Sequence, residues 1–342
     1  MATGVPRASA KPVAPEVPLW LVGAAFWAGV AAVLAARAAG LADVPAVTTL
    51  GVIFTSIVIE ALPFILLGAL VSAAIAVFVP DRAFARLARL PRGLQMPGAA
   101  VAGMGFPVCE CGSVPVARRL LARGMDPAAG VAFMLAAPIL NPIVLASTWV
   151  AYEGRGRALE MTAARAGFGL LVAMVAGLLI ARRCAGGVLR GDVEQPAAVD
   201  RSREHGPPTG ARAGEFSQHL AGDFFFMAKY LVLGAAASAL LQTVLPQSFV
   251  SGIGGTPVLA ALTMVAIAFA LSLCSEADAF VAVSFTAFPL GPQLAFLVAG
   301  PMLDTKLAVL YCATFRRSFL PLLALVVVPV AVGASLLLEA LL

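Results

Sequence analysis

The chain has 342 residues, of which 61% are hydrophobic and only 12% are charged, and its formal net charge is +5. A soluble domain has about 45–50% apolar and about 25% charged residues, so the composition excludes an ordinary soluble protein. The basic residues fall in short connections, where they set topology and do not form a nucleic-acid surface. We expect a polytopic α-helical protein of the lipid bilayer, without a nucleic-acid partner.

The N-terminal part contains a short basic tail and one apolar run. Residues 1–18, which include Arg7 and Lys11, are predicted to be a cytoplasmic tail. The apolar run Leu19–Ala36 is long for a signal peptide, and no clear cleavage site follows it. We therefore predict an uncleaved transmembrane helix within residues 19–45.

Further apolar runs follow, and several exceed the roughly 18 residues that a helix needs to cross a bilayer. They are Ala46–Val79, Gly98–Ala117, Ala128–Val150, Leu159–Ala181, Phe224–Leu245, Val258–Phe288, Leu294–Thr314 and Phe319–Leu342. Between them, residues 182–222 are polar and rich in Pro and Gly, which is typical of a disordered segment. We predict a flexible cytoplasmic linker there, between repeat 1 at residues 46–181 and repeat 2 at residues 223–342.

The division into two repeats rests on a constant spacing. Cys111 and Cys274 lie 163 residues apart, and at the same spacing Ala136–Asn141 (AAPILN) matches Ala299–Asp304 (AGPMLD). An internal duplication in so apolar a chain is typical of transporters built from two repeats, whose binding site lies where the repeats meet.

The charges beside the two cysteine segments predict how each enters the membrane. Arginines flank the first segment on both sides, whereas the flanks of the second, Pro246–Pro257 and Phe288–Gln293, carry no charge. Because basic residues favour the cytoplasm, both ends of each segment are expected on one side. This predicts two re-entrant helical hairpins, entering from opposite faces and broken near their cysteines. Ordinary full spans at residues 98–124 and 257–288, eight or nine in all, remain the alternative.

The expected fold class is therefore an all-α polytopic membrane protein. It has two inverted repeats, each with a broken re-entrant hairpin, and an extra N-terminal helix, which gives seven full spans. Abundant Ala, Gly and Arg indicate a bacterium with GC-rich DNA, so we predict a bacterial plasma-membrane protein with a cytoplasmic N-terminus.

The segment Cys109-Glu110-Cys111 carries the strongest local signal for a binding site. Buried cysteines often only pack, but on unwound backbone two thiols two residues apart can converge on one ion. Cys274 lies at the equivalent place in the other repeat. Since thiolates select soft ions, we predict that Cys109, Cys111 and Cys274 bind a soft substrate such as a trivalent metalloid. Cys312 is expected in the core.

Charged and polar side chains inside apolar segments are the other candidates. A charge at the bilayer centre costs about 2.5–3.5 kcal/mol, so each needs a partner or a cavity. Glu110 and Glu276 lie beside the cysteines and are candidates for binding substrate or protons. Asp304 and its equivalent Asn141 share a Pro-x-Leu-Asn/Asp pattern, which favours a common central site. Lys306 is a further candidate, although it lies close enough to Asp304 for a structural ion pair.

Four motifs cover both repeats: FPVCECGSVP at Phe106–Pro115, APILNP at Ala137–Pro142, LCSEAD at Leu273–Asp278 and GPMLDTK at Gly300–Lys306. They resemble the family of predicted permeases that includes the organoarsenical efflux permease ArsP and its YraQ-like relatives. The resemblance implies an integral membrane permease. For the arsenical members it implies export of trivalent, thiol-reactive organoarsenicals with cysteines as ligands.

We predict a permease that exports a soft, thiol-reactive substrate, with protons as a candidate coupling ion. A transmembrane thiol–disulfide electron carrier and a permease for a small inorganic anion remain alternatives, as does a membrane subunit that needs another chain. No GxxxxGK[ST] motif occurs, and the sequence predicts neither an enzyme nor a bound cofactor.

Overall fold

The computed structural model describes residues 45–80, 91–105, 108–184, 187–190, 209–244 and 256–341. Within these ranges the chain is almost entirely helical and forms no strand, which confirms the all-α fold class. The predicted tail at residues 1–18 and the predicted N-terminal helix at residues 19–45 lie outside the described residues, except for Pro45.

The helices fall into two sets, one before and one after residues 191–208. The first set is α2 (Pro45–Phe78), α4 (Arg92–Ala102), the 3-10 helix η2 (Gly103–Gly105), α5 (Glu110–Ala122), α6 (Pro127–Leu140), α7 (Pro142–Glu153) and α8 (Ala158–Arg183). The second set is α9 (Thr209–Val244), α11 (Pro257–Leu271), α12 (Asp278–Ser284), α13 (Leu290–Ala299), α14 (Thr305–Thr314) and α15 (Phe319–Leu341). We call α2–α8 the first repeat and α9–α15 the second.

The two sets correspond at the 163-residue spacing of the cysteines. Adding 163 to the bounds of α2, 45–78, gives 208–241, and α9 spans 209–244. The same shift places α6 at 290–303 and α7 at 305–316, where α13 and α14 begin at residues 290 and 305. The duplication seen around the cysteines therefore extends along the helices of both repeats.

Five stretches among the described residues are long and apolar enough to cross a bilayer: α2, α6 with α7, α8, Ala213–Val244 of α9, and α15. The chain is thus a multi-pass membrane protein. The apolar run at residues 294–314 is divided into two helices, because α13 ends at Ala299 and α14 begins at Thr305. Pro301 lies in the turn between them, where its missing N–H removes a helical hydrogen bond.

The helices beside the cysteine segments are short. α4, α5, α11 and α12 have 11, 13, 15 and 7 residues. At about 1.5 Å per residue, even α11 reaches only about 22 Å, which is less than the roughly 30 Å hydrocarbon core. No one of these helices crosses the bilayer alone, and the re-entrant hairpins and the faces from which they enter stay predictions.

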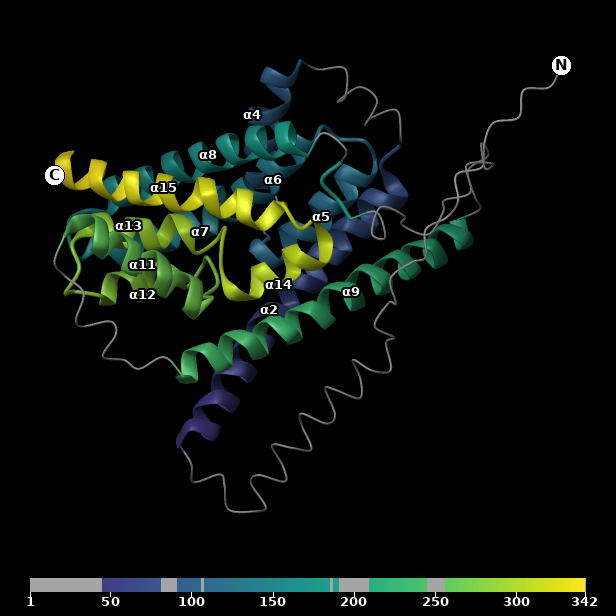
Figure 1. Cartoon of the computed structure of the whole chain (residues 1–342). Coiled ribbons are helices and arrows are strands. Elements are labelled where there is room, and N and C mark those ends of the chain that lie inside the picture. Colours follow the sequence, from purple (N-terminus) through teal and green to yellow (C-terminus); the bar gives the residue numbers. More distant parts are fainter. Residues whose placement is uncertain are drawn as a thin grey trace.

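Equivalent long helices of the two repeats pack against each other in opposite directions. Phe78 at the end of α2 contacts Phe216 near the start of α9, with ring centroids 6.1 Å apart. Cys184, just after α8, lies 3.6 Å (Sγ to Oγ) from Ser318, just before α15. Figure 1 shows α2 beside α9 and α8 beside α15. Inverted repeats require such antiparallel pairs, and the inversion across a membrane stays a prediction.

The predicted linker at residues 182–222 is too long at its C-terminal end. α9 begins at Thr209, so residues 209–222 are helical, while residues 191–208 lie outside the described part of the chain. Phe216 and Leu220 are the only large apolar residues of this extension, too few to show a helical period, so the sequence pattern could not separate it from a linker.

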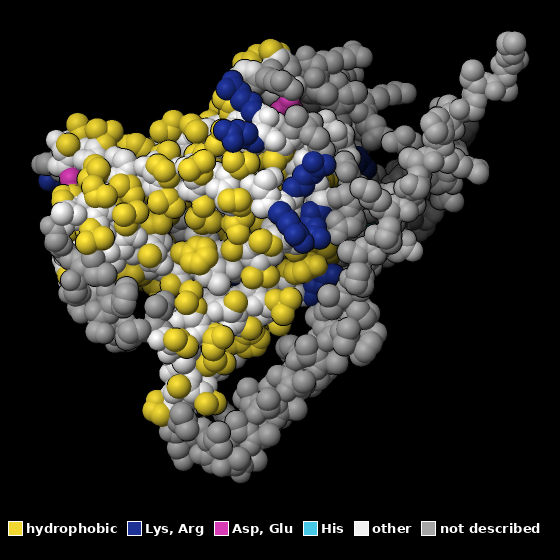
Figure 2. Space-filling view, viewed as in Figure 1, with side chains coloured by type: hydrophobic (Ala, Val, Ile, Leu, Met, Phe, Trp, Pro, Cys, Tyr) yellow, Lys and Arg dark blue, Asp and Glu magenta, His cyan; other side chains and the backbone are white. Residues whose placement is uncertain are grey.

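Exposed hydrophobic side chains cover much of the surface, as lipid contact requires (Figure 2). Most Lys and Arg side chains visible in Figure 2 gather along one edge of this surface. Arg182 and Arg183 end α8, and Arg316 and Arg317 precede α15, so the packing of these helix ends brings four arginines to one end of the bundle.

Candidate substrate site

The two helix breaks meet at a buried cluster of two thiols and one carboxylate. Cys109 precedes α5, Glu110 is the first residue of α5, and Cys274 lies in the loop between α11 and α12. The two Sγ atoms and a carboxylate oxygen of Glu110 all lie within 4.8 Å of one another. Cys109, Glu110 and Cys274 are 0%, 1% and 3% exposed. We call these three residues the thiol–carboxylate cluster.

Hydrogen bonds from α14 hold the second break open. α11 ends at Leu271 because Ser272 adopts a left-handed backbone conformation with φ 48°, which costs about 1–3 kcal/mol outside glycine. The start of α14 compensates: Thr305 N donates to Ser272 Oγ (3.1 Å), and Thr305 Oγ1 donates to the carbonyl of Phe269 (2.8 Å). The loop that carries Cys274 is therefore fixed by a helix of its own repeat.

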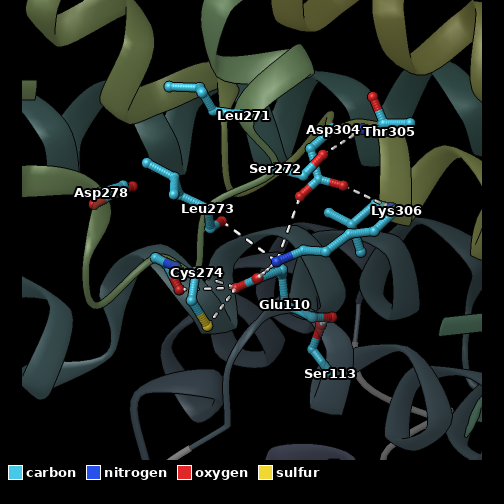
Figure 3. Close-up of polar contacts among 12 residues, drawn as sticks. Glu110, Ser113, Leu271, Ser272, Leu273, Cys274, Asp278, Asp304, Thr305 and Lys306 are labelled. Atoms are coloured by element: carbon cyan, nitrogen blue, oxygen red, sulfur yellow. Dashed lines mark hydrogen bonds and ion pairs between the residues drawn. The ribbon is translucent and has the colours of Figure 1, made fainter. Parts of the chain in front are cut away.

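Lys306 lies between two carboxylates (Figure 3). Its Nζ is 2.7 Å from Glu110 Oε1 and 3.7 Å from Asp304 Oδ2, and it donates to the carbonyl of Leu273 at 3.4 Å. The sequence suggested a pair within residues 304–306, but the closer partner of Lys306 is Glu110 of the other repeat. Lys306 is only 4% exposed, so the charge needs these acceptors.

Asn141 and Asp304 have the same local role in the two repeats. Asn141 Oδ1 accepts from Ile143 N (2.9 Å) and caps α7, and Asp304 Oδ1 accepts from Leu307 N (2.6 Å) and caps α14. Nδ2 of Asn141 and Oδ2 of Asp304 are buried without a hydrogen-bond partner. Asp304 adjoins the cluster through Lys306, whereas a substrate contact for Asn141 stays a prediction.

The other predicted residues lie around the cluster. Cys111 is buried in the first turn of α5 and is not one of the three clustered residues. Glu276 is half-buried, two residues after Cys274, and its Oε2 is buried without a hydrogen-bond partner. Cys312 is exposed, so its predicted core position is wrong.

Sequence reasoning missed Arg165, which is fully buried in α8. Its guanidinium binds Asp278 through two parallel contacts of 2.9 Å and 2.7 Å, and it also donates to Thr148 Oγ1 at 2.8 Å. Such a bidentate pair is the strong form of an Arg–carboxylate contact. An arginine in the middle of the apolar run Leu159–Ala181 was the signal that could have found it.

Ser275, also missed, joins Arg165 to the cluster. Its Oγ donates to Glu110 Oε2 at 3.0 Å, and its carbonyl accepts from Arg165 at 3.2 Å. The contacts from Lys306 through Glu110 and Ser275 to Arg165 and Asp278 form one buried polar network across both repeats. Two thiols could bind one soft ion here, with several ionisable groups around it. Because these groups contact one another, a change in the protonation of one would affect the others.

Comparisons with known proteins agree with a transporter. Residues 47–340 match the family ArsP_1, described as predicted permease. The chain is 40% identical over 288 residues to the UPF0718 protein YcgR of Bacillus subtilis (strain 168), covering 84% of this chain and 96% of that protein.

A second relative comes from Streptococcus mutans. It is named a putative two-component membrane permease complex subunit and is 35% identical over 270 residues, covering 78% of this chain and 87% of that protein. No solved structure matches the chain. The match over both repeats and the identity to these relatives show that the chain belongs to the ArsP_1 family of predicted permeases.

Proposed function

We propose that the chain exports a soft, thiol-reactive substrate, such as a trivalent organoarsenical, through a central site at the thiol–carboxylate cluster. The observation that carries this proposal is the meeting of Cys109 and Cys274, one from each repeat, within 4.8 Å of each other and of Glu110. A thiol pair with one carboxylate suits a thiophilic centre far better than Mg²⁺ or Ca²⁺.

The proposed capture step is a condensation. An organoarsenous acid, R–As(OH)₂, would form two As–S bonds with the thiols of Cys109 and Cys274 and release two water molecules. Glu110 Oε2 lies 4.0 Å from Cys274 Sγ and can accept the thiol proton as the As–S bond forms. That proton then leaves with a departing hydroxide as water. Cys111, two residues after Cys109 in the first turn of α5, is a third thiol near the cluster.

Coupling to protons is supported by the charges of the buried network. Among the described residues it holds two cations, Lys306 and Arg165, and three fully buried carboxyl groups, Glu110, Asp278 and Asp304. Three carboxyl groups face only two cations, and a buried carboxylate without a counter-charge is costly. One of the three is therefore expected to carry a proton. We propose that protonation of Glu110 moves Lys306 toward Asp304 and weakens the contact between repeats.

Alternating access would follow from this change. The antiparallel pairs α2–α9 and α8–α15 support two inverted repeats that rock around the cluster. The arginines at the ends of α8 and before α15 favour that end as cytoplasmic, with substrate entering there and leaving on the opposite face.

Uptake of a trivalent phenylarsenical by everted membrane vesicles tests the proposal. Cys109→Ser and Cys274→Ser should each abolish most uptake, because each removes one of the two thiols proposed to form the As–S bonds. Cys312→Ser is the matched control, since this thiol is exposed and should leave uptake unchanged. Undiminished uptake by the Cys109→Ser and Cys274→Ser double variant would reject the thiol site.

The proximity of the same two sulfurs also supports a second candidate, a thiol–disulfide electron carrier. In that function Cys109 and Cys274 would lose two electrons and two protons to an incoming disulfide, which would be reduced to a dithiol. Trapping a mixed disulfide between Cys109→Ser or Cys274→Ser and thioredoxin would support it. Identical electrophoretic mobility of the oxidised and reduced wild-type chain would count against it.

A small inorganic anion is a weaker candidate substrate. Anions bind at helix N-termini, but the first turn of α5 already holds Glu110 and that of α12 holds Asp278. Since one relative is named a subunit of a two-component complex, a partner chain also enters the proposal. Uptake by liposomes that contain only this purified chain tests whether a second subunit is needed.

A further inference from the structure

A separate small cavity, partly open to the outside, lies between α5 and α9. It is lined by Pro115, Arg118, Arg119, Ala122 and Asp223. Arg119 follows Glu110 by nine residues on α5, so the cavity lies about 13 Å along the helix from the thiol–carboxylate cluster. It is therefore a different site.

Two arginines that line this cavity contact the same carboxylate, and a lysine lies beside them. Arg119 Nη2 lies 2.8 Å from Asp223 Oδ2, and Arg118 Nη1 lies 3.5 Å from Asp223 Oδ1. The Arg118 guanidinium also lies 4.5 Å from the centre of the Phe226 ring, and Lys229 Nζ lies 5.0 Å from the same centre. Two cations next to one ring leave an excess of positive charge that an anion would neutralise.

Among the described residues, the acidic side chains nearby do not remove this excess. Asp223 Oδ2 already accepts from Ser72 Oγ (2.6 Å) as well as from Arg119. Glu215 lies two helical turns earlier on α9 and faces His219, whose Nε2 is 3.9 Å away. His219 in turn has its Nδ1 3.5 Å from Arg119 Nη2.

The cavity lies where its helices leave the apolar region. Before Asp223, α9 carries the polar side chains Glu215, Gln218 and His219, and the apolar run begins at Phe224, directly after Asp223. α5 ends at Ala122, a few residues beyond Arg119, and α2 ends at Phe78 beside the start of α9. This depth is that of lipid headgroups, and Figure 2 shows Lys and Arg gathered along one edge of the hydrophobic surface.

We propose that this cavity binds a phosphate group, either the headgroup of an anionic phospholipid or free inorganic phosphate. Arginine offers a planar fork of donors that matches phosphate oxygens, and lysine adds a point charge at the end of a flexible chain. Lipid is favoured by the neighbouring surface of α9, where Phe225 and Leu233 are 51% and 55% exposed and can contact acyl chains. This site is independent of the transport mechanism proposed above.

Native mass spectrometry of the full-length protein in detergent tests the proposal. Wild-type protein should retain phosphatidylglycerol in preference to phosphatidylcholine. Arg118→Gln and Lys229→Gln should each weaken phosphatidylglycerol binding about fivefold, the effect of one cation near a headgroup. Arg118→Lys keeps the charge and should bind within about twofold of wild type.

Arg157→Gln is the charge-matched control, because Arg157 is 40% exposed at the start of α8 and pairs only loosely with Glu160, at 3.3 Å. A second arm compares thermal stabilisation by phosphate and chloride at equal ionic strength. Stabilisation by phosphate that is lost in Arg118→Gln, without lipid preference, would assign free phosphate. If Arg118→Gln does not fold, the same measurements on Lys229→Gln test the proposal. Wild-type affinity of Lys229→Gln for both phosphatidylglycerol and phosphate would overturn it.

Discussion

Glu110 and Lys306 are 196 residues apart in sequence, yet Lys306 Nζ lies 2.7 Å from Glu110 Oε1 in the buried centre of the protein. The contact joins α5 of the first repeat to α14 of the second. Arg165–Asp278 and Arg119–Asp223 are further buried ion pairs that cross between the repeats, at 2.7 Å and 2.8 Å. The repeats are therefore connected by charges as well as by apolar packing.

Lys306→Met should destabilise the protein by about 3–5 kcal/mol, because it leaves Glu110 buried without its counter-charge. Glu110→Gln with Lys306→Met should recover a substantial part of this loss, since neither charge then remains unpaired. Denaturant unfolding in detergent micelles measures both. A double variant that loses the full sum of the two single losses would contradict the pairing.

Arg165→Met should cost a similar amount, about 3–5 kcal/mol, because Asp278 would stay buried without its bidentate partner. Arg157→Gln removes the same charge from an exposed pair and should change stability by less than about 0.5 kcal/mol. Equal thermal unfolding temperatures for the two variants would show that the Arg165–Asp278 pair is not a structural connection.

Gly68 allows α2 to approach the start of α5. A Cβ at this position would lie 2.6 Å from the carbonyl oxygen of Gly112, a backbone atom that cannot move alone. Gly68→Ala should therefore destabilise the protein by about 1–3 kcal/mol and reduce transport, because α5 carries Glu110.

The control is Gly167→Ala on α8, where nothing lies within 4 Å of the added carbon. Alanine favours a helix over glycine by about 1 kcal/mol, so this variant should be neutral or slightly stabilising. If both alanine variants behave alike in unfolding and uptake assays, the close approach of α2 and α5 is not required.

Ser275→Ala tests whether Ser275 orients Glu110 for transport without being needed for folding. The change removes the hydroxyl that donates to Glu110 Oε2 at 3.0 Å, while the backbone carbonyl of Ser275 still accepts from Arg165. Stability should fall by no more than about 1–3 kcal/mol, whereas uptake should fall about tenfold as Glu110 loses its orientation. Ser284→Ala is the control, because this exposed hydroxyl contacts only the carbonyl of Val281 in its own helix. Wild-type uptake by Ser275→Ala would remove Ser275 from the site.

The sequence made part of this site predictable. The 163-residue spacing and the apolar composition pointed to two membrane repeats and to Cys109, Cys111 and Cys274 as neighbours, because equivalent segments of duplicated folds meet near the centre. The structure brings Cys109 and Cys274 together with Glu110, whereas Cys111, in the first turn of α5, lies outside this cluster.

The ion pairs between distant helices could not be predicted from the sequence in the same way. Lys306 selects Glu110 over Asp304 because its long side chain reaches across to another helix, and no local pattern encodes that choice. Arg165 lies in an apolar run, and its partner, Asp278, is 113 residues away in the sequence. The start of α9 at Thr209 was missed because a polar helical extension has the composition of a linker.

Mass spectrometry of one variant tests the central claim most directly. The variant keeps Cys109 and Cys274 and carries serine at Cys111, Cys184 and Cys312; it is incubated with phenylarsine oxide in detergent. We predict one phenylarsenic per chain, bound to both sulfurs, with Cys109 and Cys274 protected from alkylation. Full alkylation of both thiols in the presence of the arsenical, with no bridged adduct, would contradict the account.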